Sequence, residues 1–99
     1  MICVKVISTY RDIVAVCDSN LLGKVFEDGD FQLEVKESFY KGDEASEKQV
    51  VDFLQDMAKD DATFNIVGKE SVNAALKAGI IDNDSVGEVS GVPFALVLA

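Results

Sequence analysis

The sequence contains no histidine. Histidine is the side chain that proteins use most often as a general base near neutral pH and as a ligand for transition metals. Its absence excludes Ser-His and Cys-His catalytic pairs, and the chain has no Gly-x-Ser-x-Gly motif. We therefore expect no catalytic residue, no cofactor and no metal, and the sequence favours a non-enzymatic protein over an enzyme.

Cysteine is nearly as scarce, because Cys3 and Cys17 are the two thiols of the chain. They are too few for a disulfide framework and wrongly spaced for a zinc knuckle. Alternating apolar residues over Met1–Ile7 and Ile13–Cys17 predict a β-hairpin, and its register places Cys3 opposite Cys17. The neighbouring thiols then act either as small buried hydrophobes or as a redox switch.

Long apolar runs are absent as well. No run approaches the roughly 18–20 residues that a membrane-spanning helix needs. The first residues also lack the basic start and following apolar run of a signal peptide. We therefore expect a cytoplasmic protein with no membrane partner.

Basic residues are also few: the chain has 9 Lys and Arg and 18 Asp and Glu, which gives a net charge of −9. Most of the excess lies between Asp18 and Asp61, where thirteen acidic residues face five lysines. A field of this sign repels phosphate backbones, so direct nucleic-acid binding is not expected, whereas a basic protein or ribonucleoprotein is attracted. The simpler alternative is that the acidic residues only confer solubility.

What is present suffices for one small domain over residues 1–99, of which 48% are hydrophobic. Asp28-Gly29 predicts a second hairpin between Lys24–Phe26 and Phe31–Val35, with one long bent strand as the alternative. Ser46 and Gln49 form a capping box that starts a helix. The inward face of this helix consists of Val50, Phe53, Leu54, Met57 and Ala58.

A strand over Ala62–Val67, a helix over Lys69–Ala78 capped by Gly79, and a closing strand from Pro93 follow. We read these as a β-α-β unit whose last strand is central and covered on both faces. The sequence therefore predicts an α+β domain. Its mixed sheet has about five or six strands, from N-terminal hairpins and the β-α-β unit, and two helices cover it in two layers.

The sequence contains two candidate sites. The turn from Asn65 to Lys69 enters a helix N-terminus, where free N–H groups and the helix dipole favour anions, and Gly68 permits close backbone approach. The residues predicted to bind a small anion or nucleotide are Asn65, Gly68, Lys69, Ser71 and Gly91. The P-loop pattern is incomplete, because Glu70 follows Lys69 and the first glycine is missing. The alternative is a tight turn with a structural role.

The other candidate is Phe39-Tyr40, an aromatic pair in a loop predicted over Glu37–Ala45. It forms either an exposed contact patch or a plug in which one ring closes the end of the core. With the acidic middle of the chain, the patch favours a non-catalytic interaction or accessory module, and the anion binder is the alternative function.

Four pieces of the chain carry a resemblance: VAVCDSNLLGKVFEDGDFQLEV, then FY followed by glycine, NIVGKESVNAALKAGIID and GVPFALV. Together they resemble the archaeal family known as domain of unknown function 424. The resemblance implies a small archaeal cytoplasmic protein with no assigned activity, and it transfers no catalytic residue. It also implies a histidine after Gly-Val-Pro, where this chain has Phe94, so a histidine-based role would not apply here.

Overall fold

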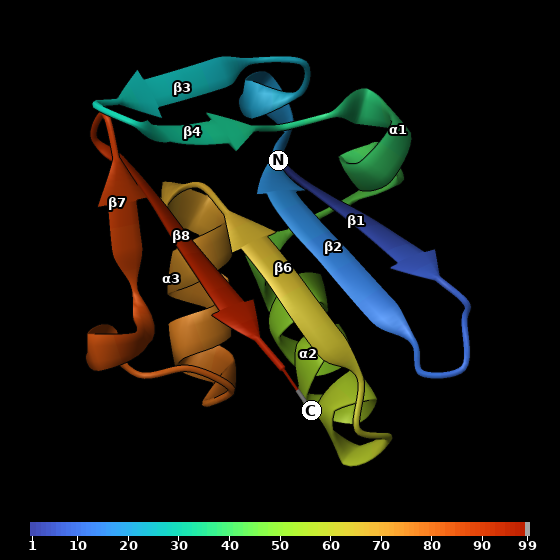
Figure 1. The fold of residues 1–99 in the computed structure, drawn as a ribbon. Coiled ribbons are helices and arrows are strands. Elements are labelled where there is room, and N and C mark those ends of the chain that lie inside the picture. Colours follow the sequence, from blue (N-terminus) through green and yellow to red (C-terminus); the bar gives the residue numbers. More distant parts are fainter. Residues whose placement is uncertain (99) are drawn as a thin grey trace.

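The computed structural model describes residues 1–98 and contains a six-stranded mixed sheet with a separate two-stranded hairpin (Figure 1). The large sheet has the order β5-β1-β2-β6-β8-β7. Its strands are β1 (Ile2–Ile7), β2 (Ile13–Asp18), β5 (Asp43–Ala45), β6 (Thr63–Val67), β7 (Gly87–Val89) and β8 (Val92–Val97). The hairpin consists of β3 (Val25–Asp28) and β4 (Phe31–Glu34). The helices are α1 (Glu37–Tyr40), α2 (Glu47–Lys59) and α3 (Lys69–Ala78), with short 3₁₀ turns at Ser19–Leu21 and Asn83–Ser85. The predicted α+β class is confirmed.

The N-terminal hairpin has the predicted register. Cys3 lies opposite Cys17 and Ile7 lies opposite Ile13, with residues 8–12 as the connection between the two strands. The second hairpin also forms, with Asp28 paired to Phe31 around Gly29-Asp30. The alternative of one long bent strand is therefore wrong.

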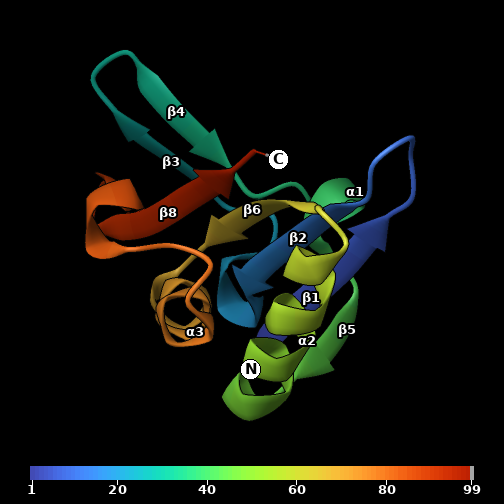
Figure 2. The same cartoon turned by 90° about the horizontal axis from the view of Figure 1, so that it is seen from below.

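Helices α2 and α3 cover one face of the large sheet (Figure 2). The predicted capping box is present: the Ser46 N–H donates to Gln49 Oε1 at 2.9 Å, and the Gln49 N–H donates to Ser46 Oγ at 3.3 Å. Gly79 ends α3 in the left-handed conformation, as predicted, with φ +77°. Between sheet and helices lies the main core, whose largest buried members include Ile2, Val14, Val16, Val50, Leu54, Phe64 and Ile66.

A partial third layer corrects the predicted two-layer packing. The β3–β4 hairpin and α1 lie on the sheet face opposite the long helices (Figure 2). A second core forms there from the buried residues Cys3, Ala15, Cys17, Val35, Tyr40 and Val67. The prediction failed because sequence alternation shows that a face is apolar but not which distant segment covers it.

The position of β8 is a second correction. It pairs antiparallel with both β6 and β7, one place from the edge of the sheet, whereas β2 and β6 are central and parallel to each other. The turn at Ser90-Gly91 makes β7 and β8 a hairpin, so the chain returns antiparallel to β6 instead of crossing over in parallel. Nor is β8 covered on both faces, because Leu96 is 55% exposed.

The predicted loop over Glu37–Ala45 is more ordered than expected. It contains the single-turn helix α1 and the short edge strand β5, whose Ala45, Glu44 and Asp43 pair with Ile2, Cys3 and Val4. None of the helices in the described part of the chain is long and apolar enough to cross a membrane.

Candidate functional site

The turn between β6 and α3 is built around Asp18, the last residue of β2. Because β2 and β6 run in parallel, with Cys17 beside Val67, their carboxyl ends meet at the start of α3. Asp18 Oδ1 accepts hydrogen bonds from the Ser71 N–H at 2.9 Å and the Ser71 hydroxyl at 2.8 Å. Its Oδ2 accepts from the Glu70 N–H at 3.2 Å. A buried carboxylate from a distant strand thus caps the helix.

Gly68 makes this approach possible. A Cβ at this position would lie 2.3 Å from Asp18 Cγ, and the backbone has φ +110°, which side-chain-bearing residues rarely adopt. The glycine therefore admits the carboxylate of Asp18 to the helix terminus, a structural role close to the alternative considered from the sequence.

The structure brings together three of the five residues predicted to bind an anion. Gly68, Lys69 and Gly91 line a shallow pocket of about 230 Å³, which the carboxylate of Asp18 also borders. Asn65 does not line it, because it lies within β6 beside Ala15 and Leu96. Ser71 is buried and turned inward to Asp18. Since Asp18 already accepts from the Glu70 and Ser71 N–H groups, the site offers an incoming anion the side chain of Lys69 beside a carboxylate.

The aromatic pair splits between core and surface. The Tyr40 ring is 7% exposed and packs in the second core, edge-on to Phe39 with ring centroids 5.0 Å apart. Burial, reinforced by Cys17, raises the pKa of Tyr40 to about 12. Phe39 is half-buried. Tyr40 is thus a ring that plugs the core, and it does not present a free contact surface.

Neither Cys3 nor Cys17 is in a disulfide, both are buried, and Cys3 Sγ lies 3.6 Å from Ser19 Oγ. Burial, followed by the charges of Cys3 and Asp18, raises the pKa of Cys17 to about 12. A thiol of that pKa is almost entirely protonated near neutral pH, so it is a poor nucleophile.

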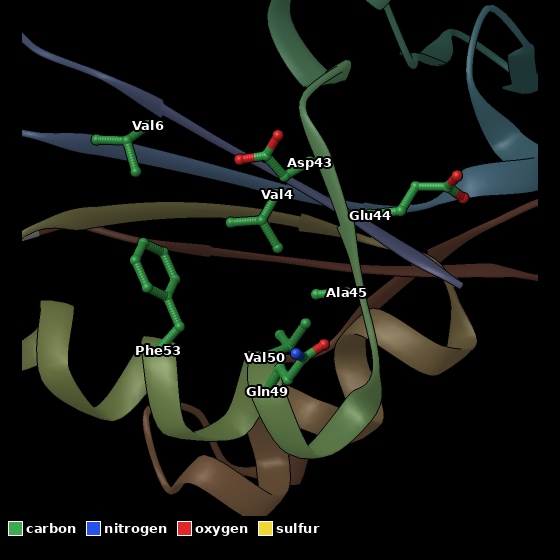
Figure 3. A pocket seen from close by; sticks show the side chains of 8 residues that line it. All are labelled: Val4, Val6, Asp43, Glu44, Ala45, Gln49, Val50 and Phe53. Carbon is green, nitrogen blue, oxygen red and sulfur yellow. The ribbon is translucent and has the colours of Figure 1, made fainter.

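A larger hollow lies elsewhere, between the β1–β5 edge of the sheet and α2 (Figure 3). This open groove of about 460 Å³ is lined by Val4, Val6, Asp43, Glu44, Ala45, Gln49, Val50 and Phe53. Its floor is apolar: Val4 and Val6 project from β1, and Val50 and Phe53 rise from α2. This groove could not be predicted from the sequence, because β5, which forms one wall, has no apolar alternation.

The charged groups at the groove are carboxylates. Figure 3 shows Asp43 and Ala45 on the groove side of β5 and Glu44 on the opposite side. The lining includes no Lys or Arg, and the amide of Gln49 is held by Ser46. Lys5, the lysine of β1, donates from Nζ to the Ser38 carbonyl at 2.8 Å, toward α1. A ligand of this groove therefore meets apolar side chains and negative charge.

The chain is thus a small α+β domain in which a mixed six-stranded sheet carries two helices on one face and a hairpin on the other. It belongs to the family described as "Protein of unknown function (DUF424)", whose model matches residues 7–99, so the resemblance is confirmed. A crystal structure of an uncharacterized conserved protein from the archaeon Methanopyrus kandleri has the same fold, with a TM-score of 0.87 at 20% sequence identity. The superposition covers 99% of this chain and 93% of that chain. No match was found among curated proteins.

Proposed function

We propose that this protein is a protein-interaction module that binds a basic, partly apolar segment of a partner protein in the groove between β1, β5 and α2. The observation that supports it is the composition of the groove, an apolar floor with a carboxylate at its wall and no lysine or arginine in the lining. Apolar contacts supply affinity, and the carboxylate selects positive charge and steers association.

The charge of the whole chain favours the same class of partner. The groove is built partly from β5 and α2, which lie in the acid-rich stretch between Asp18 and Asp61. A protein of net charge −9 attracts a basic segment from a distance and repels acidic ones. Val6 is 40% exposed, and a bound segment that covers it would gain binding free energy because apolar surface is removed from water.

Selection from a random twelve-residue peptide library on the immobilised full chain tests the proposal. We expect enrichment of peptides that combine Lys or Arg with apolar residues. The affinity of a synthesised selected peptide for the protein, measured by fluorescence anisotropy, should be at least about tenfold lower for the Val6→Lys variant. Val25→Lys is the matched control, because Val25 is also an exposed strand valine, 47% accessible, and lies on β3 away from the groove.

The charge term has its own matched pair. Asp43→Asn removes the carboxylate on the groove side and should weaken binding and its salt dependence, whereas Glu44→Gln removes the neighbouring carboxylate on the other side and should change less. Enrichment of acidic or uncharged peptides, or equal effects of Val6→Lys and Val25→Lys, would contradict the proposal.

A further inference from the structure

The edge of the sheet beside the groove is open. Strand β5 pairs with β1 from Ile2 to Val4, where Val4 lies opposite Asp43. Strand β1 continues for three more residues to Ile7, and no strand among residues 1–98 pairs with their outer side. Unpaired main-chain groups at a sheet edge are a template for an additional strand.

The direction of these main-chain groups follows from Gly42. A Cβ on Gly42 would lie 2.2 Å from the carbonyl oxygen of Val4, which places that carbonyl on the β5 side of β1. In an antiparallel sheet the N–H and C=O of alternate residues point to the same side. The N–H and C=O of Val6 therefore point outward beyond the end of β5, and those of Lys5 and Ile7 point to β2.

The side chains of β1 alternate in the same way. Val4 and Val6 project into the groove, and Lys5 projects to the other face of the sheet. A residue placed opposite Val6 would send its side chain into the groove, toward Phe53. Its two neighbours would point away from it. Where the segment leaves the edge, it passes Asp43, and a basic side chain there meets the carboxylate.

We infer that the partner segment binds as an added β-strand, hydrogen-bonded to the N–H and C=O of Val6 and placing one apolar side chain in the groove. This inference rests on the proposed function and specifies its mode of recognition. A second copy of the chain would meet the same main-chain groups, but each copy has a net charge of −9 and would bring its own Asp43 to the contact. Charge complementarity therefore assigns the edge to a basic segment.

Amide hydrogen exchange of the full chain with the selected peptide tests the inference. We expect the Val6 N–H to exchange at least about tenfold more slowly in the complex, while the N–H groups of Lys5 and Ile7, already bonded to β2, change little. The peptide is then scanned with single N-methylated residues, which removes one main-chain donor at a time. N-methylation of the peptide residue whose N–H bonds to Val6 should lower the affinity of the peptide about tenfold, whereas N-methylation of its immediate neighbours should not.

The outcomes separate the two proposals. A peptide that binds the groove while the Val6 exchange rate stays unchanged and the N-methyl scan is flat overturns strand addition and leaves the proposed function standing. Absence of any peptide that depends on Val6 overturns the proposed function itself. Dimers of the isolated chain in sedimentation, with the Val6 N–H protected, identify a second copy as the occupant and overturn the inference.

Discussion

Removing the carboxylate of Asp18 should destabilise the fold far more than removing an exposed cap. Asp18→Ala leaves the N–H groups of Glu70 and Ser71 and the Ser71 hydroxyl without their acceptor. Loss of a helix cap costs about 0.5–2 kcal/mol, and each buried donor left unpaired adds about 1–3 kcal/mol unless water reaches it. With about 1 kcal/mol for the cap and about 1 kcal/mol for each of the two buried Ser71 donors, we expect a loss of about 3 kcal/mol in the free energy of unfolding. This corresponds to a fall in Tm of about 12–24 °C for a domain of this size.

Urea unfolding followed by circular dichroism measures this effect. The matched control is Asp82→Ala, because Asp82 also caps a short turn, accepting from the Ser85 N–H at 3.1 Å and the Ser85 hydroxyl at 3.0 Å, but on the exposed surface. There water replaces the lost acceptor, so we expect about 1 kcal/mol or less. Equal losses in the two variants would refute the reasoning that burial of Asp18 makes its cap costly.

Gly68 provides the second half of a double-mutant cycle. Gly68→Ala should destabilise by about 2–4 kcal/mol, because the new Cβ meets Asp18 at 2.3 Å and φ is +110°. In the Asp18→Ala background the steric part of that cost disappears and the backbone strain remains. The two losses should therefore fall short of additivity by 1 kcal/mol or more, on the order expected for contacting residues. Additive losses would show that Gly68 is required for its backbone conformation alone.

Two further predictions concern anions and alkaline pH. Millimolar inorganic phosphate should not raise the Tm above that in chloride of equal ionic strength, because Asp18 occupies the terminus of α3. A rise that disappears in Lys69→Ala would instead support anion binding. Cys17 and Tyr40, whose pKa values rise from 9.0 and 10.0 to about 12, stay neutral in the folded chain and ionise more easily when it unfolds. Their contribution to stability is therefore present below about pH 9 and is lost as the pH rises toward 12, so the urea midpoint should fall in that range and fall less in Tyr40→Phe.

Local patterns in the sequence were enough to predict several elements of the fold. The alternation of the first two strands gave their register, down to Cys3 opposite Cys17. The capping box at Ser46 and the glycine at the end of α3 marked helix boundaries that the structure confirms. Each of these features depends on residues within one turn or one hairpin, where spacing alone determines which groups meet.

Features that depend on distant pairing were not predictable in the same way. Strand β5 is three residues, Asp43 to Ala45, without apolar alternation, and it is a strand because it lies against β1. For the candidate turn, the sequence singled out Gly68 and Lys69 but not Asp18, which lies 53 residues before its partner Ser71. A polar residue directly after a buried strand was the available signal, and its meaning required knowing that β2 and β6 are neighbours.

Helix termini and strand edges both leave main-chain groups without partners inside their own element. The start of α3 and the end of β1 are two such places, and they differ in whether the rest of the chain supplies the partners. At the start of α3, beside Gly68 and Lys69, Asp18 accepts hydrogen bonds from the N–H groups of Glu70 and Ser71. At the end of β1, the outward groups of Val6 have no strand beside them in the described part of the chain, and an apolar groove adjoins them. A ligand gains binding free energy where main-chain groups have no partner within the protein and apolar surface is exposed to water. The edge of β1 is therefore a stronger candidate for a binding site than the start of α3.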